Sequence, residues 1–216
     1  MLRILPVLVL LPLPGRACEM ALLLATDVSG SVDADEDAPQ VKGLADAPDD
    51  PGIAGVLVQG QVALAVVQWS GVGAQALVPP RTPKRGRAGV ARLAADARAR
   101  PRAFAASDTA AGQAISFSAA QFAAVPECHL QVIGISGDGP GDAGFTVGQA
   151  RQAAQAGGIE ITAVAIKAMG PSSPITSFCR RRVIIRGGDV MTARGLGGYP
   201  RAMRAKFMRE LTRPGS

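Results

Sequence analysis

Short, continuous apolar runs recur along the chain, separated by longer stretches rich in alanine and polar residues. A run of this length without polar alternation is typical of a strand buried on both faces, as in a mostly parallel sheet. We therefore predict six strands, the last of them weak, at residues 20–26, 62–69, 75–78, 130–135, 159–166 and 190–193.

The stretches between these runs predict helices. The first begins at Asp33, where Glu36 can complete a capping box, and it is ended by Pro48 and Pro51. Pro39 lies inside it and removes a backbone donor, which predicts a kink or a late start. The other helices are expected at residues 90–100, 109–124, 146–156, 173–182 and 199–211. The alternation predicts a doubly wound α/β fold, a mostly parallel six-stranded sheet with helices on both faces.

Composition is that of one globular domain. Apolar residues make up 48% of the chain, charged residues 19% and aromatic residues only 4%, which indicates a core of small and branched aliphatic side chains. The sequence contains neither a repeat nor a low-complexity linker. We expect a single domain over residues 18–216.

The first 17 residues are typical of an export signal. Arg3 is followed by an apolar run over residues 4–13, and Gly15 and Ala17 are the small residues expected before a cleavage site. No other run is long enough to span a bilayer, so we expect a soluble product in the periplasm or outside the cell. A lipidated Cys18 is the alternative.

The formal net charge is +6, and +4 without the two arginines of the leader. Few aromatic residues are interleaved with the basic ones as stacking partners, so we expect a solvated helix face and no nucleic-acid partner. The basic excess lies near the C-terminus, in Arg180, Arg181, Arg182, Arg186, Arg194, Arg201, Arg204, Lys206, Arg209 and Arg213.

Three polar segments lie where predicted strands end or a predicted helix begins. A D-x-S-x-S turn follows the first strand, with Asp27, Ser29 and Ser31; Thr109 opens an alanine-rich helix, and Asp138 follows the fourth strand. In a doubly wound sheet such strand ends meet at one edge. Two carboxylates and three hydroxyls form a hard oxygen set, which suits Mg²⁺ first and otherwise Ca²⁺ or Mn²⁺.

A resemblance to the von Willebrand factor A domain, also known from integrin I domains, is carried by these segments. The first metal-site motif of that fold is similar to ALLLATDVSGSVD, its threonine loop to SDTAAGQAI, and its third loop to VIGISGDGP. Together with VALAVVQWSG and YPRAMRAKFMREL, they look like a group of exported bacterial von Willebrand A-like proteins of unassigned function. The resemblance runs from about Cys18 to Leu211.

The resemblance implies roles for the polar residues. Ser29, Ser31 and Thr109 would coordinate the ion directly, and Asp27 and Asp138 would balance its charge, directly or through water. A coordination position is left open in that family and is commonly filled by the carboxylate of a partner. Three residues are candidates for the ligand rim: Trp69, Asp108 and Asp142. Trp69 ends the second predicted strand, so packing in the core or at the rim is its main expectation and contact with the ligand the alternative.

Two departures from the family pattern affect this expectation. The usual T-D-G of the third loop is replaced here by Ser136-Gly137-Asp138-Gly139, which leaves the reach of Asp138 open. The prolines of the first helix can also alter the rim. The structural alternative is that the aspartates cap helices and that the serines belong to ordinary turns.

The three cysteines fit an exported protein. In the resembled fold the first and fourth strands are parallel neighbours, and Cys18 and Cys128 precede Asp27 and Asp138 by similar distances. The resemblance therefore implies a Cys18–Cys128 disulfide at the opposite end of the sheet, with three free thiols as the alternative. Cys179 is left over, either buried or free for intermolecular pairing.

Other candidate motifs are weak. His129 is the only histidine, which argues against histidine-based zinc sites and Ser-His-Asp hydrolysis. Asp33, Asp35 and Asp37 have calcium-loop spacing but lack the glycine and the terminal glutamate. The glycine-rich segment at residues 137–141 lacks a phosphate-loop Lys-Ser/Thr pair.

The sequence thus favours a metal-dependent binding module that recognises a protein or other ligand presenting a carboxylate. The runner-up is a metal-dependent hydrolase in which the same ion activates water. A third possibility is a domain that binds metal only for stability.

Overall fold

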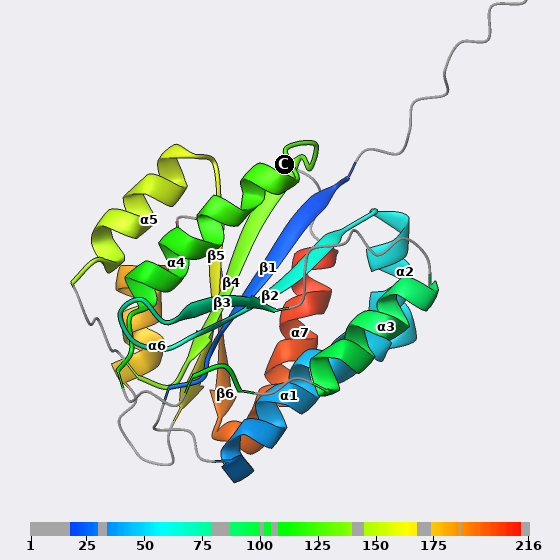
Figure 1. Ribbon diagram of the computed structural model, residues 1–216, viewed down its shortest axis with the longest axis horizontal. Helices are drawn as coiled ribbons and strands as arrows, with labels where there is room; N and C mark the ends of the chain where they lie inside the picture. Colours follow the sequence, from blue (N-terminus) through cyan, green and yellow to red (C-terminus); the bar gives the residue numbers. More distant parts are fainter. Residues whose placement is uncertain are drawn as a thin grey trace, which may run out of the picture.

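The computed structural model describes residues 18–29, 34–78, 87–99, 102–104, 108–139, 145–167, 174–185 and 187–212. Its centre is a six-stranded sheet in the order β3-β2-β1-β4-β5-β6 (Figure 1). Neighbouring strands are parallel except for β3, which runs antiparallel to β2. The predicted mostly parallel sheet is therefore confirmed, with one antiparallel edge strand. The strands are β1 Met20–Asp27, β2 Ala63–Trp69, β3 Gln75–Val78, β4 Leu130–Gly137, β5 Glu160–Lys167 and β6 Val190–Arg194.

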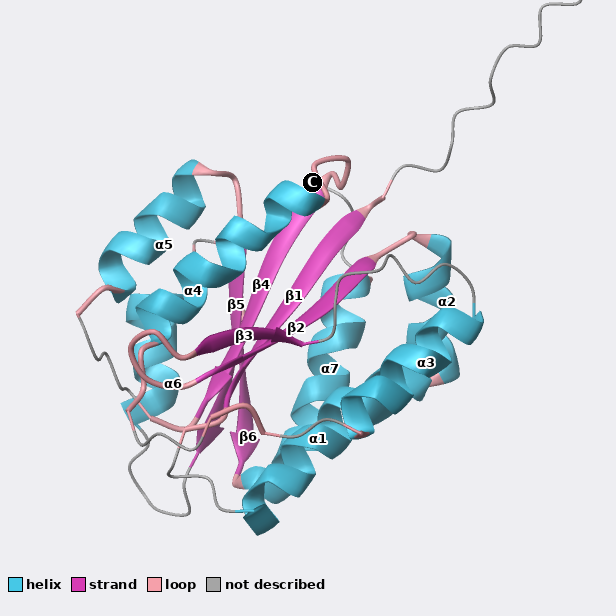
Figure 2. Cartoon of the chain, in the orientation of Figure 1, coloured by secondary structure: helices cyan, strands magenta, loops and turns pink. Residues whose placement is uncertain are grey.

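Helices cover both faces of the sheet (Figure 2). One face carries α4 Ala111–Ala120, η1 Gln121–Ala124, α5 Val147–Ala156, α6 Pro174–Phe178 and the π-helical turn η2 Cys179–Val183. The other carries α1 Ala34–Asp49, α2 Pro51–Gln59 and α7 Tyr199–Leu211, while α3 Arg87–Arg98 packs on α1 and α2. A short η3 turn, Leu196–Gly198, precedes α7.

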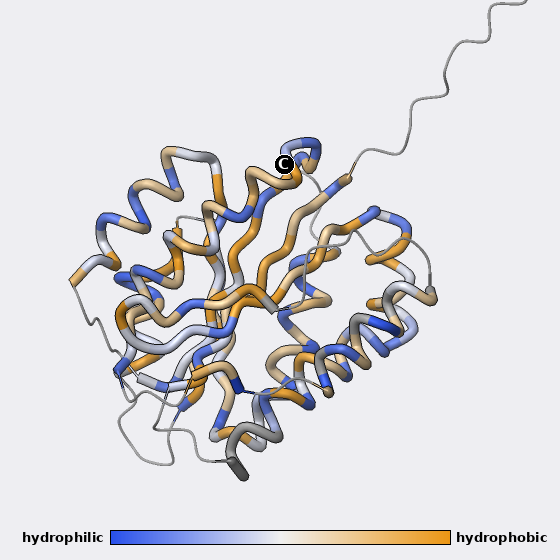
Figure 3. The backbone as a smooth tube through the Cα atoms, in the orientation of Figure 1, coloured by the Kyte–Doolittle hydropathy of each residue, from blue (hydrophilic) through white to orange (hydrophobic). Residues whose placement is uncertain are grey.

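The continuous apolar runs supply side chains to two hydrophobic cores, one on each face of the sheet. Along β1, Leu22 and Leu24 face α1, α2 and α7, whereas Leu23 and Ala25 face α4 and α5. Successive side chains of a strand point to opposite faces, so an all-apolar strand fills two helix–sheet interfaces. The apolar strands run through the middle of the molecule in Figure 3.

The first helical region differs from the prediction in two respects. Helix α1 begins at Ala34, so Pro39 does not delay its start, and it continues past Pro48 to Asp49. A separate helix, α2, then forms where the sequence predicted only an end. Oδ1 of Asp50 accepts hydrogen bonds from the N–H groups of Gly52 (3.0 Å) and Ile53 (3.2 Å). Pro51 at the first helical position needs no donor, so this proline starts a helix rather than ending one.

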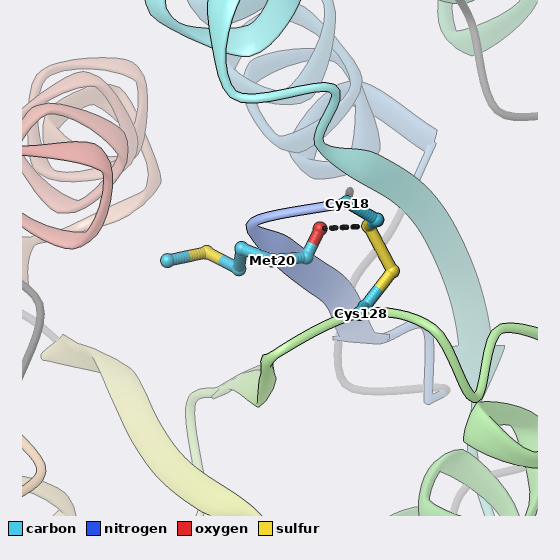
Figure 4. The surroundings of a disulfide bond; sticks show 3 residues. All are labelled: Cys18, Met20 and Cys128. Atoms are coloured by element: carbon cyan, nitrogen blue, oxygen red, sulfur yellow. Dashed lines mark hydrogen bonds between the residues drawn. A yellow bond between two sulfur atoms is a disulfide. The ribbon is translucent and has the colours of Figure 1, made fainter. Parts of the chain in front are cut away.

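The disulfide between Cys18 and Cys128 is present, as predicted, with 4.4 Å between the two Cα atoms. We call the edge of the sheet where the parallel strands begin the amino edge, and the edge where they end the carboxyl edge. The disulfide lies at the amino edge, next to the carbonyl of Met20 (Figure 4). Cys179 is free and buried.

None of the helices in the described ranges is long and apolar enough to cross a bilayer. The proposed leader, residues 1–17, lies outside those ranges, as do Asp33 and residues 140–144.

Candidate metal centre

Asp27 is the last residue of β1 and is buried, with 1% of its surface exposed. Its Oδ1 accepts a hydrogen bond from the Ser29 N–H at 2.9 Å, so the turn after the strand holds one carboxylate oxygen. Across the ranges that the structure describes, Oδ2 has no hydrogen-bond partner. A buried carboxylate oxygen without a partner is costly and calls for a proton, a water molecule or a cation.

The surroundings raise the pKa of Asp27 from 3.8 to about 7. Desolvation by burial is the largest cause, because it penalises the charged form. Hydrogen bonds from Ser29 lower the pKa, the negative charge of Asp138 raises it, and the Arg102 guanidinium lowers it. The electrostatic coupling shows that Asp138 and Arg102 lie in the neighbourhood of the Asp27 carboxylate.

Strand β4 brings the third loop to Asp27. It continues two residues past its predicted end, and Thr26 pairs with Ser136 in the β1–β4 register. A β-carbon placed on Gly137 would lie 3.1 Å from Oδ2 of Asp27. The glycine therefore leaves room beside the unpaired oxygen, and Asp138 follows it directly.

The Thr109 segment is fastened to the end of β2. Ser70, the residue after that strand, accepts the Ala110 N–H at 2.9 Å through its backbone carbonyl. Its hydroxyl donates to the carbonyl of Asp108 at 3.1 Å. The two bonds fall on either side of Thr109 and place it at the carboxyl edge, next to β1. There Val28 donates its N–H to the Trp69 carbonyl at 2.8 Å.

Arg102 is a residue that the sequence analysis missed. Its Nε donates to the carbonyls of Val28 and Phe104, both at 2.9 Å, and its guanidinium also donates to the carbonyl of Ser29. The side chain thus fastens the loop after β1 to the segment before α4. Arg102 belongs to no motif in an arginine-rich chain, so the sequence offers no signal for this role.

The remaining predicted site residues fall in different places. Asp108 is exposed near the start of α4. Trp69 is only 2% exposed and packs in the core, so it lies beneath the loops instead of on an open rim. Ser31 and Asp142 lie outside the described residues.

The residues present fit a hard cation. Asp27, Ser29, Thr109 and Asp138 all lie at the carboxyl edge, and the unpaired Oδ2 of Asp27 gives the site an unneutralised oxygen. Oxygen donors of this kind suit Mg²⁺ and its hard relatives. The described residues contain no cluster of three or more His, Cys, Asp or Glu side chains suited to a metal, and the predicted set has only two carboxylates.

Solved structures of von Willebrand factor A type share this fold. Proximal thread matrix protein 1 from the mussel byssus, with a zinc-occupied MIDAS motif, superposes with a TM-score of 0.67 at 13% identity, covering 88% of this chain and 48% of that one. The pilus adhesin SpaC from Lactobacillus rhamnosus GG superposes with a TM-score of 0.67 at 10% identity, and the match covers 89% of this chain and 31% of that one. A von Willebrand factor type A protein from Catenulispora acidiphila superposes with a TM-score of 0.53 at 19% identity, and the match covers 89% of this chain and 42% of that one.

The chain therefore has the fold of a von Willebrand factor A-like domain. The chain spans about half the length of the mussel protein that it resembles. No curated protein matches its sequence. Residues 17–215 match the family described as "Protein of unknown function (DUF1194)", and the chain belongs to that family.

Proposed function

We propose that this protein is a metal-dependent binding module that acts outside the cytoplasm. Ser29, Ser31 and Thr109 coordinate one divalent cation, Mg²⁺ in the first place, with Asp27 and Asp138 as its charge-balancing pair. A carboxylate of a partner completes the coordination shell. The single observation that carries the proposal is the buried Asp27 carboxylate, with one oxygen held by Ser29 and the other unpaired beside Gly137.

Other observations support the binding role. A pilus adhesin and a byssus matrix protein have the same fold, and the structure of the latter has zinc in its MIDAS motif. The only histidine, His129, lies at the amino edge, where its backbone N–H donates to the Cys18 carbonyl at 3.1 Å. It is therefore remote from the proposed ion and cannot act there as a general base, which disfavours the hydrolase alternative.

The location outside the cytoplasm rests on the disulfide and on the export signal proposed for residues 1–17. Disulfides persist in oxidising compartments and are rare in the cytosol. Export would give the domain access to envelope or extracellular partners.

A metal-titrated thermal melt tests the proposal. Wild-type protein stripped with EDTA is expected to gain stability on addition of Mg²⁺, because the ion binds only the native state. Asp27→Ala and Thr109→Ala should lose that gain, whereas Glu127→Ala, exposed at the amino edge, should keep it. If Mg²⁺, Ca²⁺ and Mn²⁺ all leave the wild-type melting temperature unchanged, the proposal is wrong.

A further inference from the structure

Two large apolar side chains are exposed in the described part of the chain. Val72 has 61% of its surface exposed and Phe145 has 90%. Single exposed apolar residues are ordinary on protein surfaces. These two lie in loops at the carboxyl edge of the sheet, on the same edge as Asp27 and Thr109.

Each belongs to a segment that contacts the first turn of α4, the helix that begins directly after Thr109 and Ala110. On one side, the β2–β3 loop carries Val72, and the N–H of the neighbouring Gly73 donates to the Gln113 side chain at 2.8 Å. The same loop passes close to Asp108, since a β-carbon on Gly71 would lie 3.0 Å from the Asp108 β-carbon. Val72 is therefore attached to the segment that presents Thr109.

On the other side, the chain entering α5 carries Phe145. A β-carbon on Gly112 would come within 2.5 Å of the backbone of Thr146 and Val147, so these segments are in direct contact. Phe145 itself has a φ of +51°, a conformation that L-residues other than asparagine and aspartate rarely adopt. Its ring is exposed although neighbouring apolar residues such as Val147 are buried.

The geometry points to an apolar rim, formed by Val72 and Phe145, that selects protein partners in which the metal-binding acidic residue is flanked by aliphatic or aromatic residues. This inference rests on the proposed function, because the rim borders the proposed ion on the side of Thr109. A partner bound at the ion would cover apolar side chains exposed beside it, and burying their surface adds hydrophobic stabilisation. Aromatic residues are also favoured as anchors in protein interfaces.

A peptide partner fits this rim better than a glycan does. Val72 offers neither a flat face for stacking on a sugar ring nor a hydrogen bond for a hydroxyl group. Aliphatic and aromatic side chains of a peptide can cover both residues while the acidic side chain between them reaches the ion. The cation would then supply attraction for the carboxylate, and the rim would supply discrimination between acidic sequences.

A peptide selection tests the inference. A random dodecapeptide library displayed on phage is bound to immobilised protein in Mg²⁺ and eluted with EDTA. Wild-type protein is expected to enrich Asp or Glu flanked by apolar residues. The Val72→Ser/Phe145→Ser double variant should retain acidic peptides but lose the apolar flanks. A labelled peptide chosen by the wild type should bind this variant with a Kd higher by about tenfold or more.

Controls separate this inference from the proposed function. Ala123→Ser, exposed near the amino edge, should select the same peptides as the wild type. The double variant should keep the Mg²⁺-dependent melting shift. Three results would contradict the inferred rim while the Mg²⁺ shift stays intact. The wild type could enrich acidic peptides without apolar flanks, the double variant could still select the apolar flanks, or EDTA could elute no peptide at all. In each case the proposed metal binding would stand. If the wild type shows no Mg²⁺ shift, the proposed function itself fails.

Discussion

Gly137 lies so close to Asp27 that a β-carbon on it would be 3.1 Å from the unpaired Oδ2 and 3.5 Å from the Asp27 β-carbon. The distance to Oδ2 is shorter than an ordinary van der Waals contact, so a larger residue must shift the carboxylate by a few tenths of an ångström. A glycine on β4 thereby controls the position of a carboxylate on β1.

Gly137→Ala should therefore weaken Mg²⁺ binding by about tenfold, the lower end of the range for changes around metal ligands, with little loss of stability. Calorimetric titration checks the affinity. Gly134→Ala, three residues earlier on the same strand, is the matched control. Its β-carbon would lie 2.6 Å from Cε of the buried Lys206, so it should destabilise the fold by about 1–3 kcal/mol and leave the affinity of the folded protein unchanged. Equal affinities for Gly137→Ala and wild type would contradict the proposed position of the ion.

The raised pKa of Asp27 predicts a pH-dependent stability of the metal-free protein. Between pH 3.8 and about 7 the native carboxyl keeps a proton that the unfolded chain has released, so stability falls as pH rises through this window. The loss is complete above pH 7 and has an upper bound of about 4 kcal/mol. Asp27→Asn should remove this fall and melt at a higher temperature than the wild type at pH 8 in EDTA, yet gain nothing from Mg²⁺. If the melting temperatures of the wild type and of Asp27→Asn change with pH in the same way in EDTA, the pKa of Asp27 is not raised by burial.

Arg102 should act as a positioning residue for the metal loop. Arg102→Ala leaves the carbonyls of Val28, Ser29 and Phe104 without this donor, which should cost about 1–3 kcal/mol and lower Mg²⁺ affinity by about 10–100-fold. Arg102→Lys should rescue little, because an ammonium group lacks the planar fork of donors. Arg92→Ala, exposed on α3, is the control. Denaturant unfolding and calorimetry separate the two effects, and an Arg102→Ala variant with wild-type affinity would exclude the role.

The disulfide should be a major source of stability. It joins residues 110 positions apart, so in the chain-entropy model it contributes about 4–5 kcal/mol. Cys18→Ser/Cys128→Ser should lower the melting temperature by roughly 8–20 °C, given about 2–4 °C per kcal/mol for a domain of this size.

Thiol labelling gives an independent check of the disulfide. Burial raises the pKa of Cys179 to about 12, so the native protein should resist iodoacetamide at pH 8. Denaturation without reductant should expose one thiol, and reduction should expose three. Labelling of all three without reductant would rule the disulfide out.

Lys206 and Glu210 form a buried ion pair on the face of α7 that packs on the sheet, and both contact the hydroxyl of Thr162. Removing one partner leaves a buried charge uncompensated. Lys206→Met or Glu210→Leu alone should each cost about 3–5 kcal/mol, whereas the double variant should recover most of the loss. Additive effects in chemical denaturation would mean that the pair is not coupled.

Much of the fold could be read from local pattern. The apolar runs predicted all six strands, with ends displaced by at most two residues, because a strand buried on both faces has no polar positions. Helix α7 matches its predicted range, 199–211. The second helix, α2, was missed because Pro51 suits either the end of one helix or the first position of the next, and only the capping by Asp50 decides.

The residue types of the candidate site were also available from the sequence, since Asp27, Ser29, Thr109 and Asp138 follow strands or open a helix at readable positions. What the sequence could not supply is their environment. The burial of Asp27, which raises its pKa, depends on the strands on either side of β1. The sequence also left open whether Trp69 packs in the core or contacts the ligand, and the fold buries it.

The sequence by itself determined the order of strands and helices, the oxygen-bearing loops and the pairing of Cys18 with Cys128 that the family resemblance implies. Only the tertiary structure decided that Arg102 holds a loop 73 and 74 residues earlier, and that the segments carrying Val72 and Phe145 contact the helix that follows Thr109. The physical reason is the range of the interactions. Strand and helix preferences act over a few neighbouring residues, whereas hydrogen bonds and close contacts between distant loops exist only once the sheet has brought those loops to one edge.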